Sequence, residues 1–333
     1  MTATTAQEVP AKPAGTSSRR RIAAGAVTAY ILVAVGLPAV VDAYTISLAS
    51  TAVALALLAL STQLLTGVAG LPSLGQAAYF GAGAYTTALL AGEGVTFAPA
   101  QLGLAMLAGA GAAAVTAPLV LRTRGTTFLL VSFAVQQLAA TAASQWGSVT
   151  GGDGGLHVAA ITLWPGAAAV TGDGYLYWYV LAVFLALSAA MALLLTSTLG
   201  LALRGCADHE PRMAALGHRV TGQLTAAYVI AGAVAAGGGA LLVAAHRYVS
   251  PADLGFEVAA LALLAAAIGA GSMRGAVAGA VLVVAARDLV GARTGGHGAA
   301  VLGLLLLCVV YLRPHLARAA RTVTDLRWGR RAR

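Results

Sequence analysis

Residues 43–92 form a run of 50 positions without a single Asp, Glu, Lys or Arg. Similar uncharged runs cover residues 94–121, 125–152, 174–203 and 220–246. A helix needs about 20 apolar residues to cross roughly 30 Å of hydrocarbon, so each run is long enough to span a bilayer. Only 9% of the chain is charged, against about 25% in a soluble domain. A soluble helical core would need charged helix faces that are absent here, so the sequence predicts an all-α, polytopic membrane protein.

We predict ten membrane-spanning helices, with eight to ten as the range because charged residues are closely spaced within 256–291. The predicted spans are 22–41, 48–67, 73–92, 99–121, 126–144, 174–198, 222–245, 256–272, 275–291 and 299–313. With both termini in the cytoplasm, seventeen of the 20 Lys and Arg residues lie on the cytoplasmic side, as the positive-inside rule requires. This distribution suits anionic membrane lipid and gives no support to nucleic-acid binding.

The chain is expected to comprise a disordered cytoplasmic tail (1–21), a transmembrane domain (22–313) and a basic cytoplasmic tail (314–333). The arginines before residue 22 resemble the start of a signal peptide, but the apolar stretch after them is too long for a signal core, which favours a retained first span. Cys206 and Cys308 show neither metal-ligand nor disulfide spacing. Lys12 is the only lysine, so the chain lacks the lysine of a nucleotide-binding P-loop. No catalytic set, metal site or cofactor site is predicted.

The stretch GLPSLGQAAYFGAGAYTTALL, residues 70–90, is too apolar for a surface loop and too rich in glycine for an ordinary core helix. Helices in lipid associate through small residues, because lipid is as apolar as leucine. Irregular backbone at membrane depth is tolerated only inside protein or along a water-filled cavity, and we expect Pro72 and the nearby glycines to break the helix at its cytoplasmic end. The candidate translocation-path residues here are Gly75, Gln76, Gly81, Gly83 and Tyr85.

A second glycine-rich stretch, AIGAGSMRGAVAGAVL, covers residues 267–282 and adds Gly269 and Gly271 to the candidate path. Interrupted segments at corresponding positions of two halves point to a transport path between inverted-topology repeats, here spans one to five and six to ten. Gln136 is a further candidate, since a polar side chain within a span needs a hydrogen-bond partner or water. The alternatives are general helix packing for the glycines and interhelical hydrogen bonding for the glutamines.

The loop 199–221 is the most structured of the predicted cytoplasmic loops. Asp208 and Glu210 suit a helix N-terminus, Pro211 suits a first helical position, and Gly217 is a typical helix stop. The residues DHEPRMAALG, 208–217, are therefore predicted to form a short helix. Such a helix either presents a rigid surface to a cytoplasmic partner or lies along the membrane as a connector.

Four stretches, in order, resemble the permease subunits of branched-chain amino acid ABC importers. They are the glycine-rich 70–90, VTGGDGGL (149–156), GLALRGCADHEPRMAALGHRV (200–220) and YVSPADLGFEVAALALLAAAIGAGSMRGAVAGA (248–280). The family usually has Gly-Gly-x-Gly around residue 269 and an Asn near His209, and this chain departs from both. Permeases for urea and short amides are similar.

The resemblance implies a second permease subunit, identical or homologous, a cytoplasmic ABC ATPase under each permease, and an extracytoplasmic substrate-binding protein. It implies a bacterial cell (inner) membrane location and a coupling helix that contacts the ATPase. The residues assigned to that contact are Asp208, Glu210, Pro211, Arg212, Leu216 and Gly217. ATP hydrolysis is expected on a separate chain, so this subunit is not itself an enzyme.

The outer loop 145–173 contains a glycine-rich segment, whose candidate residues are Thr150, Gly151, Gly152 and Asp153. We expect it either to dock the binding protein or shape an outer gate, or to be a flexible turn. A stand-alone secondary transporter is the alternative of a different class, although no span has a carboxylate near its middle for proton coupling.

Overall fold

The structure is a computed structural model and describes residues 41–163, 172–269 and 271–294. The chain divides into two compact units, Met1–Asp42 and Ala43–Arg333, and the described helices belong to the second unit. Both predicted tails, the predicted span 299–313 and all but the last residue of the predicted span 22–41 lie outside the described residues.

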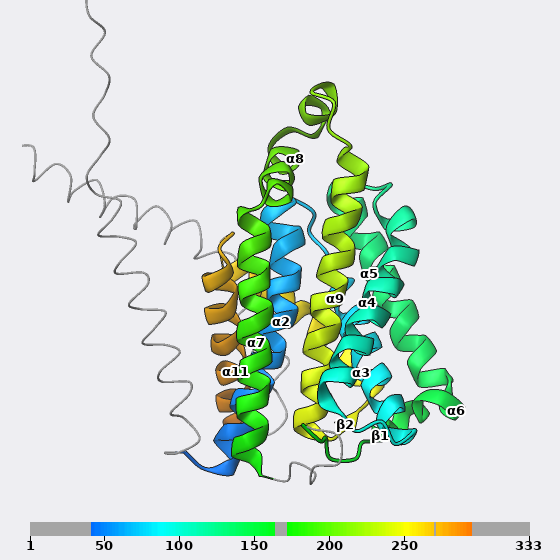
Figure 1. The fold of residues 1–333 in the computed structure, drawn as a ribbon, viewed down its shortest axis with the longest axis vertical. Helices are drawn as coiled ribbons and strands as arrows, with labels where there is room; N and C mark the ends of the chain where they lie inside the picture. The colour runs from blue at the N-terminus through cyan, green and yellow to red at the C-terminus, as the bar shows by residue number, and fades with distance from the viewer. Residues whose placement is uncertain (1–40, 164–171, 270, 295–333) are drawn as a thin grey trace, which may run out of the picture. The chain divides into compact units, whose positions relative to one another are not determined.

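The described part of the second unit is almost entirely helical, which confirms the all-α prediction (Figure 1). Its larger helices are α2 (Ala43–Gln63), α3 (Gln76–Gly92), α4 (Ala98–Val120), α5 (Gly125–Gln145), α7 (Asp173–Thr196), α8 (Thr198–Ala215), α9 (Val220–His246), α10 (Phe256–Ile268) and α11 (Met273–Thr294). The short elements are η2 (Leu64–Val68), α6 (Gly147–Thr150), η3 (Gly152–Gly154), β1 (Leu156–His157), β2 (Tyr248–Val249) and η4 (Pro251–Leu254). The two strands pair antiparallel.

Among the described residues, five helical segments are long and apolar enough to cross a membrane: Ala43–Val68, Ala98–Val120, Gly125–Gln145, Gly174–Thr196 and Val220–His246. They coincide within a few residues with predicted spans, so the chain is a polytopic membrane protein.

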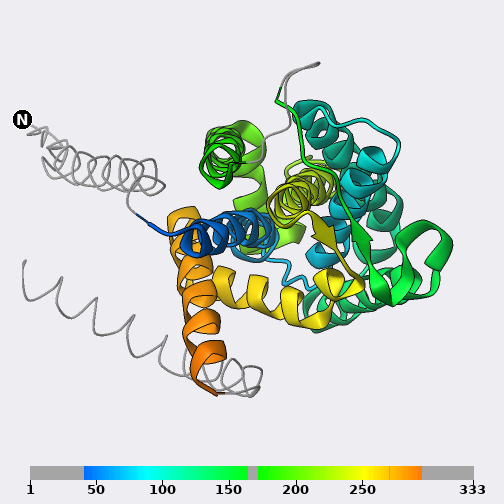
Figure 2. The same ribbon diagram turned by 90° about the horizontal axis from the view of Figure 1, so that it is seen from below.

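Helix α10 differs from the predicted span 256–272. Its 13 residues cover about 20 Å, less than the roughly 30 Å of a hydrocarbon core. It ends at Ile268, shortly before Gly271, whose φ of 84° is unfavourable for other residues. Figure 2 shows α10 and α11 from the side, whereas α7 and α9 are seen end-on, so the first pair is inclined to the second. The short segment between charged residues thus forms an inclined helix instead of a full span.

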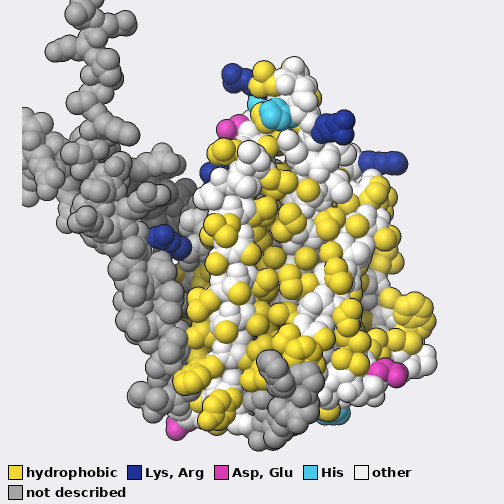
Figure 3. Space-filling model, in the orientation of Figure 1, with side chains coloured by type: hydrophobic (Ala, Val, Ile, Leu, Met, Phe, Trp, Pro, Cys, Tyr) yellow, Lys and Arg dark blue, Asp and Glu magenta, His cyan; other side chains and the backbone are white. Residues whose placement is uncertain are grey.

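Helix α9 lies at the centre of the bundle and packs against α2, α3 and α4. In an apolar 18-residue stretch of α9, 78% of the residues are buried, whereas the shares in such stretches of α4, α5 and α7 are 28%, 22% and 28%. Their outward side chains include Leu107, Val115, Leu138 and Leu193, all exposed. Figure 3 shows apolar side chains over the middle of the face in view and Lys and Arg side chains near its upper end. This distribution is typical of a lipid-facing surface.

Glycines let the central helices approach backbone to backbone. A Cβ atom added to Gly83 of α3 would lie 2.1 Å from the Ala236 oxygen of α9, and one on Gly109 of α4 would lie 2.3 Å from the Ala236 Cβ. The same addition to Gly239 would place a carbon 1.9 Å from the Phe80 carbonyl oxygen. The small residues of the glycine-rich stretch therefore serve close helix packing.

The chain is irregular between η2 and α3, as Pro72 and its neighbouring glycines predict. Residues 64–68 form one π-helical turn, a feature often found at functional sites. Gly70 then adopts φ 71°, and α3 begins at Gln76, three residues later than the predicted start of this span at 73.

The bundle has two ends, which lie at opposite ends of α9 (Figure 1). We call the end with α8 the α8 end, and the end with α6, β1, β2 and η4 the β1–β2 end.

Candidate functional site

The connection between α7 and α9 is a bent helical segment. Within α8, His209 has φ −160° and ψ 89°, so the chain leaves the helix there and then resumes it. Pro211 comes just after the bend, where a missing backbone N–H costs little. We call residues 208–217 the α8 elbow. Figure 1 shows it at the tip of the α8 end, beyond the ends of α7 and α9.

The elbow ends in a tightly closed turn. Gly217 has φ 85°, its N–H donates to the Ala214 oxygen at 3.0 Å, and the His218 N–H donates to the Met213 oxygen at 3.1 Å. These two bonds form a Schellman motif, which satisfies the last carbonyl groups of a helix and requires a left-handed residue. The helix-stop assignment of Gly217 is confirmed, and the end of the elbow is fixed by its backbone.

A bidentate ion pair ties the elbow to the α4–α5 loop. The Arg124 Nε donates to Glu210 Oε2 at 2.8 Å, and Nη2 donates to Oε1 at 2.7 Å. The third nitrogen of Arg124 donates to the carbonyl oxygens of Leu121 and Thr123. One guanidinium therefore holds the loop and the elbow together, in the geometry that makes Arg–carboxylate pairs specific.

The other residues assigned to the coupling contact are exposed. They are Asp208, Pro211, Arg212, Leu216 and Gly217. Leu216 has 68% of its surface exposed, although it is a large apolar side chain near the C-terminal end of the elbow. The elbow thus exposes one large apolar side chain among charged and small ones, an arrangement suited to contact with another protein.

Four glutamines are buried in the described part of the chain, and three of them, Gln63, Gln76 and Gln136, lie at or near predicted irregular or polar positions of the bundle. Gln136 donates from Nε2 to the Leu254 carbonyl oxygen. The Gln63 amide is best oriented to donate to the Ala266 oxygen at 2.9 Å and accept from the Gly271 N–H at 3.2 Å. Neither polar atom of Gln76 has a hydrogen-bond partner in the described part of the chain. An unpaired buried amide costs about 1–3 kcal/mol, so Gln76 stands out as a group that needs a partner.

Four candidate path glycines, Gly75, Gly81, Gly83 and Gly269, lie in contacts with other elements, whereas a Cβ added to Gly271 would meet nothing within 4 Å. Gly75 faces Ser132, and a Cβ added to Gly81 would overlap the Leu254 side chain. A Cβ added to Gly269 would lie 2.5 Å from the Ala276 nitrogen. Their place on a translocation path stays a prediction.

The glycine-rich outer loop is tightly folded where the structure describes it. The Thr150 hydroxyl is within hydrogen-bond distance of the Ala143 and Trp146 oxygens, at 2.6 and 2.7 Å. Gly151 and Gly152 have φ values of 75° and 62°, and Asp153 is exposed in the turn that follows. The roles expected for this loop, in docking the binding protein or in an outer gate, stay predictions.

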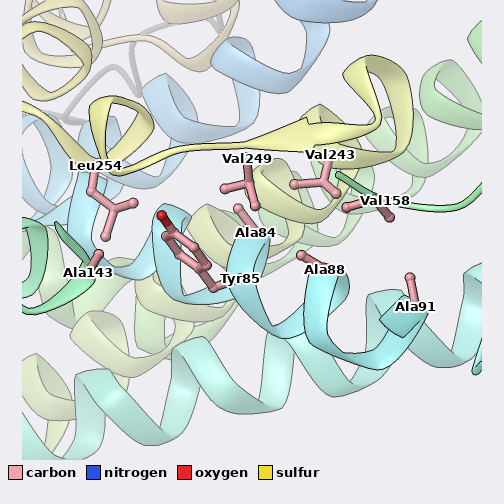
Figure 4. Packing of buried hydrophobic residues seen from close by; sticks show 9 residues of the cluster. All are labelled: Ala84, Tyr85, Ala88, Ala91, Ala143, Val158, Val243, Val249 and Leu254. Atoms are coloured by element: carbon pink, nitrogen blue, oxygen red, sulfur yellow. The ribbon is translucent and has the colours of Figure 1, made fainter. Parts of the chain in front are cut away.

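A buried apolar cluster joins this loop to the bundle. It includes Val158 of the outer loop, Tyr85 of α3, Ala143 of α5, Val243 of α9 and Leu254 of η4. Figure 4 shows Tyr85 within this cluster. The candidate path residue Tyr85 therefore lies at the β1–β2 end, far along α3 from Gln76.

The sequence did not point to Arg124, or to the charged residues around η4, as candidate site residues. Arg124 and Glu210 are 86 positions apart, so no local spacing links them. Asp253 lies in the stretch that carries the Val-Ser-Pro resemblance, which is the signal that pointed to this region.

The comparison with protein families decides the class of the chain. Residues 44–310 match the family described as branched-chain amino acid transport system, permease component. The chain belongs to this permease family. No curated protein and no solved structure matched it. The matched range contains the elbow, both glycine-rich stretches and the outer loop. The match confirms the permease family that the four sequence stretches indicate.

The ion pair at the elbow makes the stability of the permease depend on pH. Arg124 holds the pKa of Glu210 below its usual value of 4.5. The pair therefore stabilises the fold fully above that value, and the stabilisation is lost as the pH falls through it toward the lower folded-state pKa. Both side chains are more than a third exposed, so we expect at most about 1 kcal/mol. The measurement is the unfolding midpoint at several pH values between 7 and 4. The midpoint of Glu210→Gln should fall less than that of the wild type as the pH is lowered.

Proposed function

We propose that the permease is the membrane subunit of an ATP-driven importer and forms the path by which branched-chain amino acids enter a bacterial cell. The observation that supports coupling to a separate motor is the α8 elbow. It projects from the α8 end, it is closed by a Schellman turn, and it is fastened to a second loop by Arg124. The elbow is thus held at Glu210 and closed at Gly217, which suits a segment that passes a force from another protein to the helices.

The proposal includes the partners that the family resemblance implies. An ABC ATPase subunit contacts the elbow through Leu216 and the charged residues around it, and a second permease, identical or homologous, completes the membrane part. An extracytoplasmic binding protein delivers substrate at the β1–β2 end, where the folded outer loop offers Thr150 and Asp153. The α8 end then faces the cytoplasm, in the inner membrane, with both termini on that side. The inverted-topology halves stay part of this proposal.

The function is tested by reconstituting the permease with its ATPase and binding protein in liposomes. We expect L-leucine uptake that requires hydrolysable ATP and stops with a non-hydrolysable analogue. Uptake that proceeds equally without ATP would overturn the ATP-driven assignment and support a stand-alone transporter. Uptake of urea or acetamide in preference to leucine would overturn the substrate.

The orientation gives a separate prediction. In a background with both native cysteines replaced by serine, Asp153→Cys should react with a membrane-impermeant maleimide in intact cells. Leu216→Cys should react only after the cells are opened, because the elbow faces the cytoplasm. The measurement is the extent of labelling before and after lysis. Labelling of Leu216→Cys from outside would reverse the orientation and remove the elbow from reach of an ATPase.

A further inference from the structure

A cavity of about 220 Å³ opens near the β1–β2 end, within a single permease chain. Its lining comes from α2, α3, α9, the β2–η4 segment, α10 and α11. The charged or titratable groups His246, Asp253 and Arg287 lie on its wall. Such groups next to a membrane-embedded core are costly to place, which makes them candidates for a functional site. The proposed coupling at the elbow uses none of them.

The polarity of the cavity changes with depth. His246 is the last residue of α9, at the β1–β2 end, and Thr51 of α2 lies beside it. Leu242 is one turn earlier in α9 and Leu55 one turn later in α2, so both lie deeper in the bundle. Phe80, near the start of α3, completes the deep wall. A small molecule in this cavity would meet polar groups at the rim and apolar side chains below.

The rim contains a histidine nitrogen that is free to accept. The Thr51 hydroxyl donates its one proton to the Ser47 carbonyl oxygen, at 2.9 Å. The 2.7 Å contact between Thr51 Oγ1 and His246 Nε2 must then be donated by the histidine. In neutral imidazole the other nitrogen, Nδ1, is an acceptor, and no described residue bonds to it.

The two charged groups of the rim also have unused bonding capacity. Asp253 accepts from the Ser250 N–H through Oδ2, at 2.9 Å, while its Oδ1 bonds to no described residue. Arg287 contacts Glu257 through Nη2, at 3.1 Å, and its Nε and Nη1 bond to no described residue. The cavity therefore offers a cationic donor, a carboxylate acceptor and an apolar floor. A zwitterion with an apolar side chain requires these three features together.

We propose that this cavity is a receiving site for a small zwitterionic amino acid inside one permease chain. Arg287 binds the carboxylate of the ligand, Asp253 binds its ammonium group, and Leu55 and Phe80 contact its branched side chain. The inference rests on the proposed function for the identity of the ligand, but it places the ligand at residues that the coupling argument does not involve.

The site is tested on the purified full-length permease in lipid nanodiscs, without ATPase or binding protein. A bound ligand raises the unfolding midpoint in a saturable way. We expect L-leucine to do so below about 10 mM. 4-Methylpentanoate lacks the ammonium group, 3-methylbutylamine lacks the carboxylate and glycine lacks the side chain; each should bind at least about tenfold more weakly. Equal effects of leucine and the methylpentanoate would overturn the Asp253 contact, and equal effects of leucine and the amine would overturn the Arg287 contact.

Variants locate the ligand in the cavity. Arg287→Gln and Asp253→Asn should each weaken leucine binding at least about tenfold. Asparagine retains an oxygen that accepts from the Ser250 N–H, so the local turn is kept. Glu93→Gln and Arg219→Gln are the matched controls, since they make the same chemical changes on exposed residues outside the cavity. Wild-type leucine affinity in both cavity variants would overturn the site, as would the absence of a saturable leucine effect on wild type.

Uptake by the complete transporter distinguishes failure of this inference from failure of the proposed function. ATP-dependent leucine uptake that is unchanged in both cavity variants would overturn the cavity site and leave the function standing. A wild-type complex that hydrolyses ATP but takes up no branched-chain amino acid would overturn the function, and saturable, zwitterion-selective binding to the purified permease would still support the cavity.

Discussion

Gly239→Leu is expected to abolish stable folding of the permease. Gly239 lies on the central helix α9, where an added Cβ would be 1.9 Å from the Phe80 carbonyl oxygen and 3.0 Å from the Ala84 nitrogen. Both neighbours are backbone atoms of α3, so no side chain can rotate away. The two helices would have to separate, and their shared contacts with α2 and α4 would be lost with them. Overpacking of a core usually costs about 1–3 kcal/mol, and we expect this substitution to exceed that range.

The measurement is the yield of monodisperse protein after detergent extraction, together with its unfolding midpoint. Gly111→Leu is the matched control, because Gly111 lies on the exposed side of α4 and an added Cβ meets nothing within 4 Å. The control should extract and unfold like wild type. Normal yield and midpoint for Gly239→Leu would show that α3 and α9 are not in backbone contact.

Gly217→Pro is expected to abolish ATP-driven uptake while the permease still inserts into the membrane. Proline fixes φ near −65°, but residue 217 needs φ 85°. Proline also lacks the N–H that donates to the Ala214 oxygen. The Schellman turn would open and the elbow would lose its fixed end. We expect uptake to fall at least about tenfold, because the elbow no longer keeps the geometry that the ATPase would contact.

Gly217→Asn is the control for this prediction. Asparagine tolerates the left-handed conformation better than most residues, and an added Cβ at this position meets nothing within 4 Å. Uptake by the asparagine variant should stay near wild type, with both variants equally abundant in the membrane. Glu210→Lys tests the same elbow from its other end, because it replaces the ion pair with two like charges, and it should also abolish uptake. Normal uptake by both Gly217→Pro and Glu210→Lys would remove the coupling assignment.

Much of the fold could be predicted because lipid imposes a simple pattern. A span needs a long uncharged run, and these runs place α2, α4, α5, α7 and α9 within a few residues. Small side chains along 70–90 predicted close helix contacts, which the structure shows at Gly81 and Gly83. Pro72 and its neighbouring glycines predicted the interruption before α3. Each of these features depends on residues close together in the chain.

Features that depend on distant residues were not predictable. The pairing of Arg124 with Glu210 and the meeting of Asp253 with Arg287 around one cavity need the folded bundle. Helix α10 shows a different limit. Its composition suits a membrane helix, but charged residues at both sides leave too few apolar positions for a full crossing, and its inclination follows from packing against α2 and α11.

The irregular backbone between η2 and α3 has a mechanical consequence. Gly70 lies so close to α8 that a Cβ added to it would be 3.2 Å from the Ala207 Cβ and 3.3 Å from its Cα. Residues 69–75 have no continuous ladder of helical hydrogen bonds, so they bend at lower cost than the helices on either side. A displacement of α8 toward the bundle would therefore press on this irregular segment at Ala207 before it reached the start of α3, where the unpaired Gln76 lies.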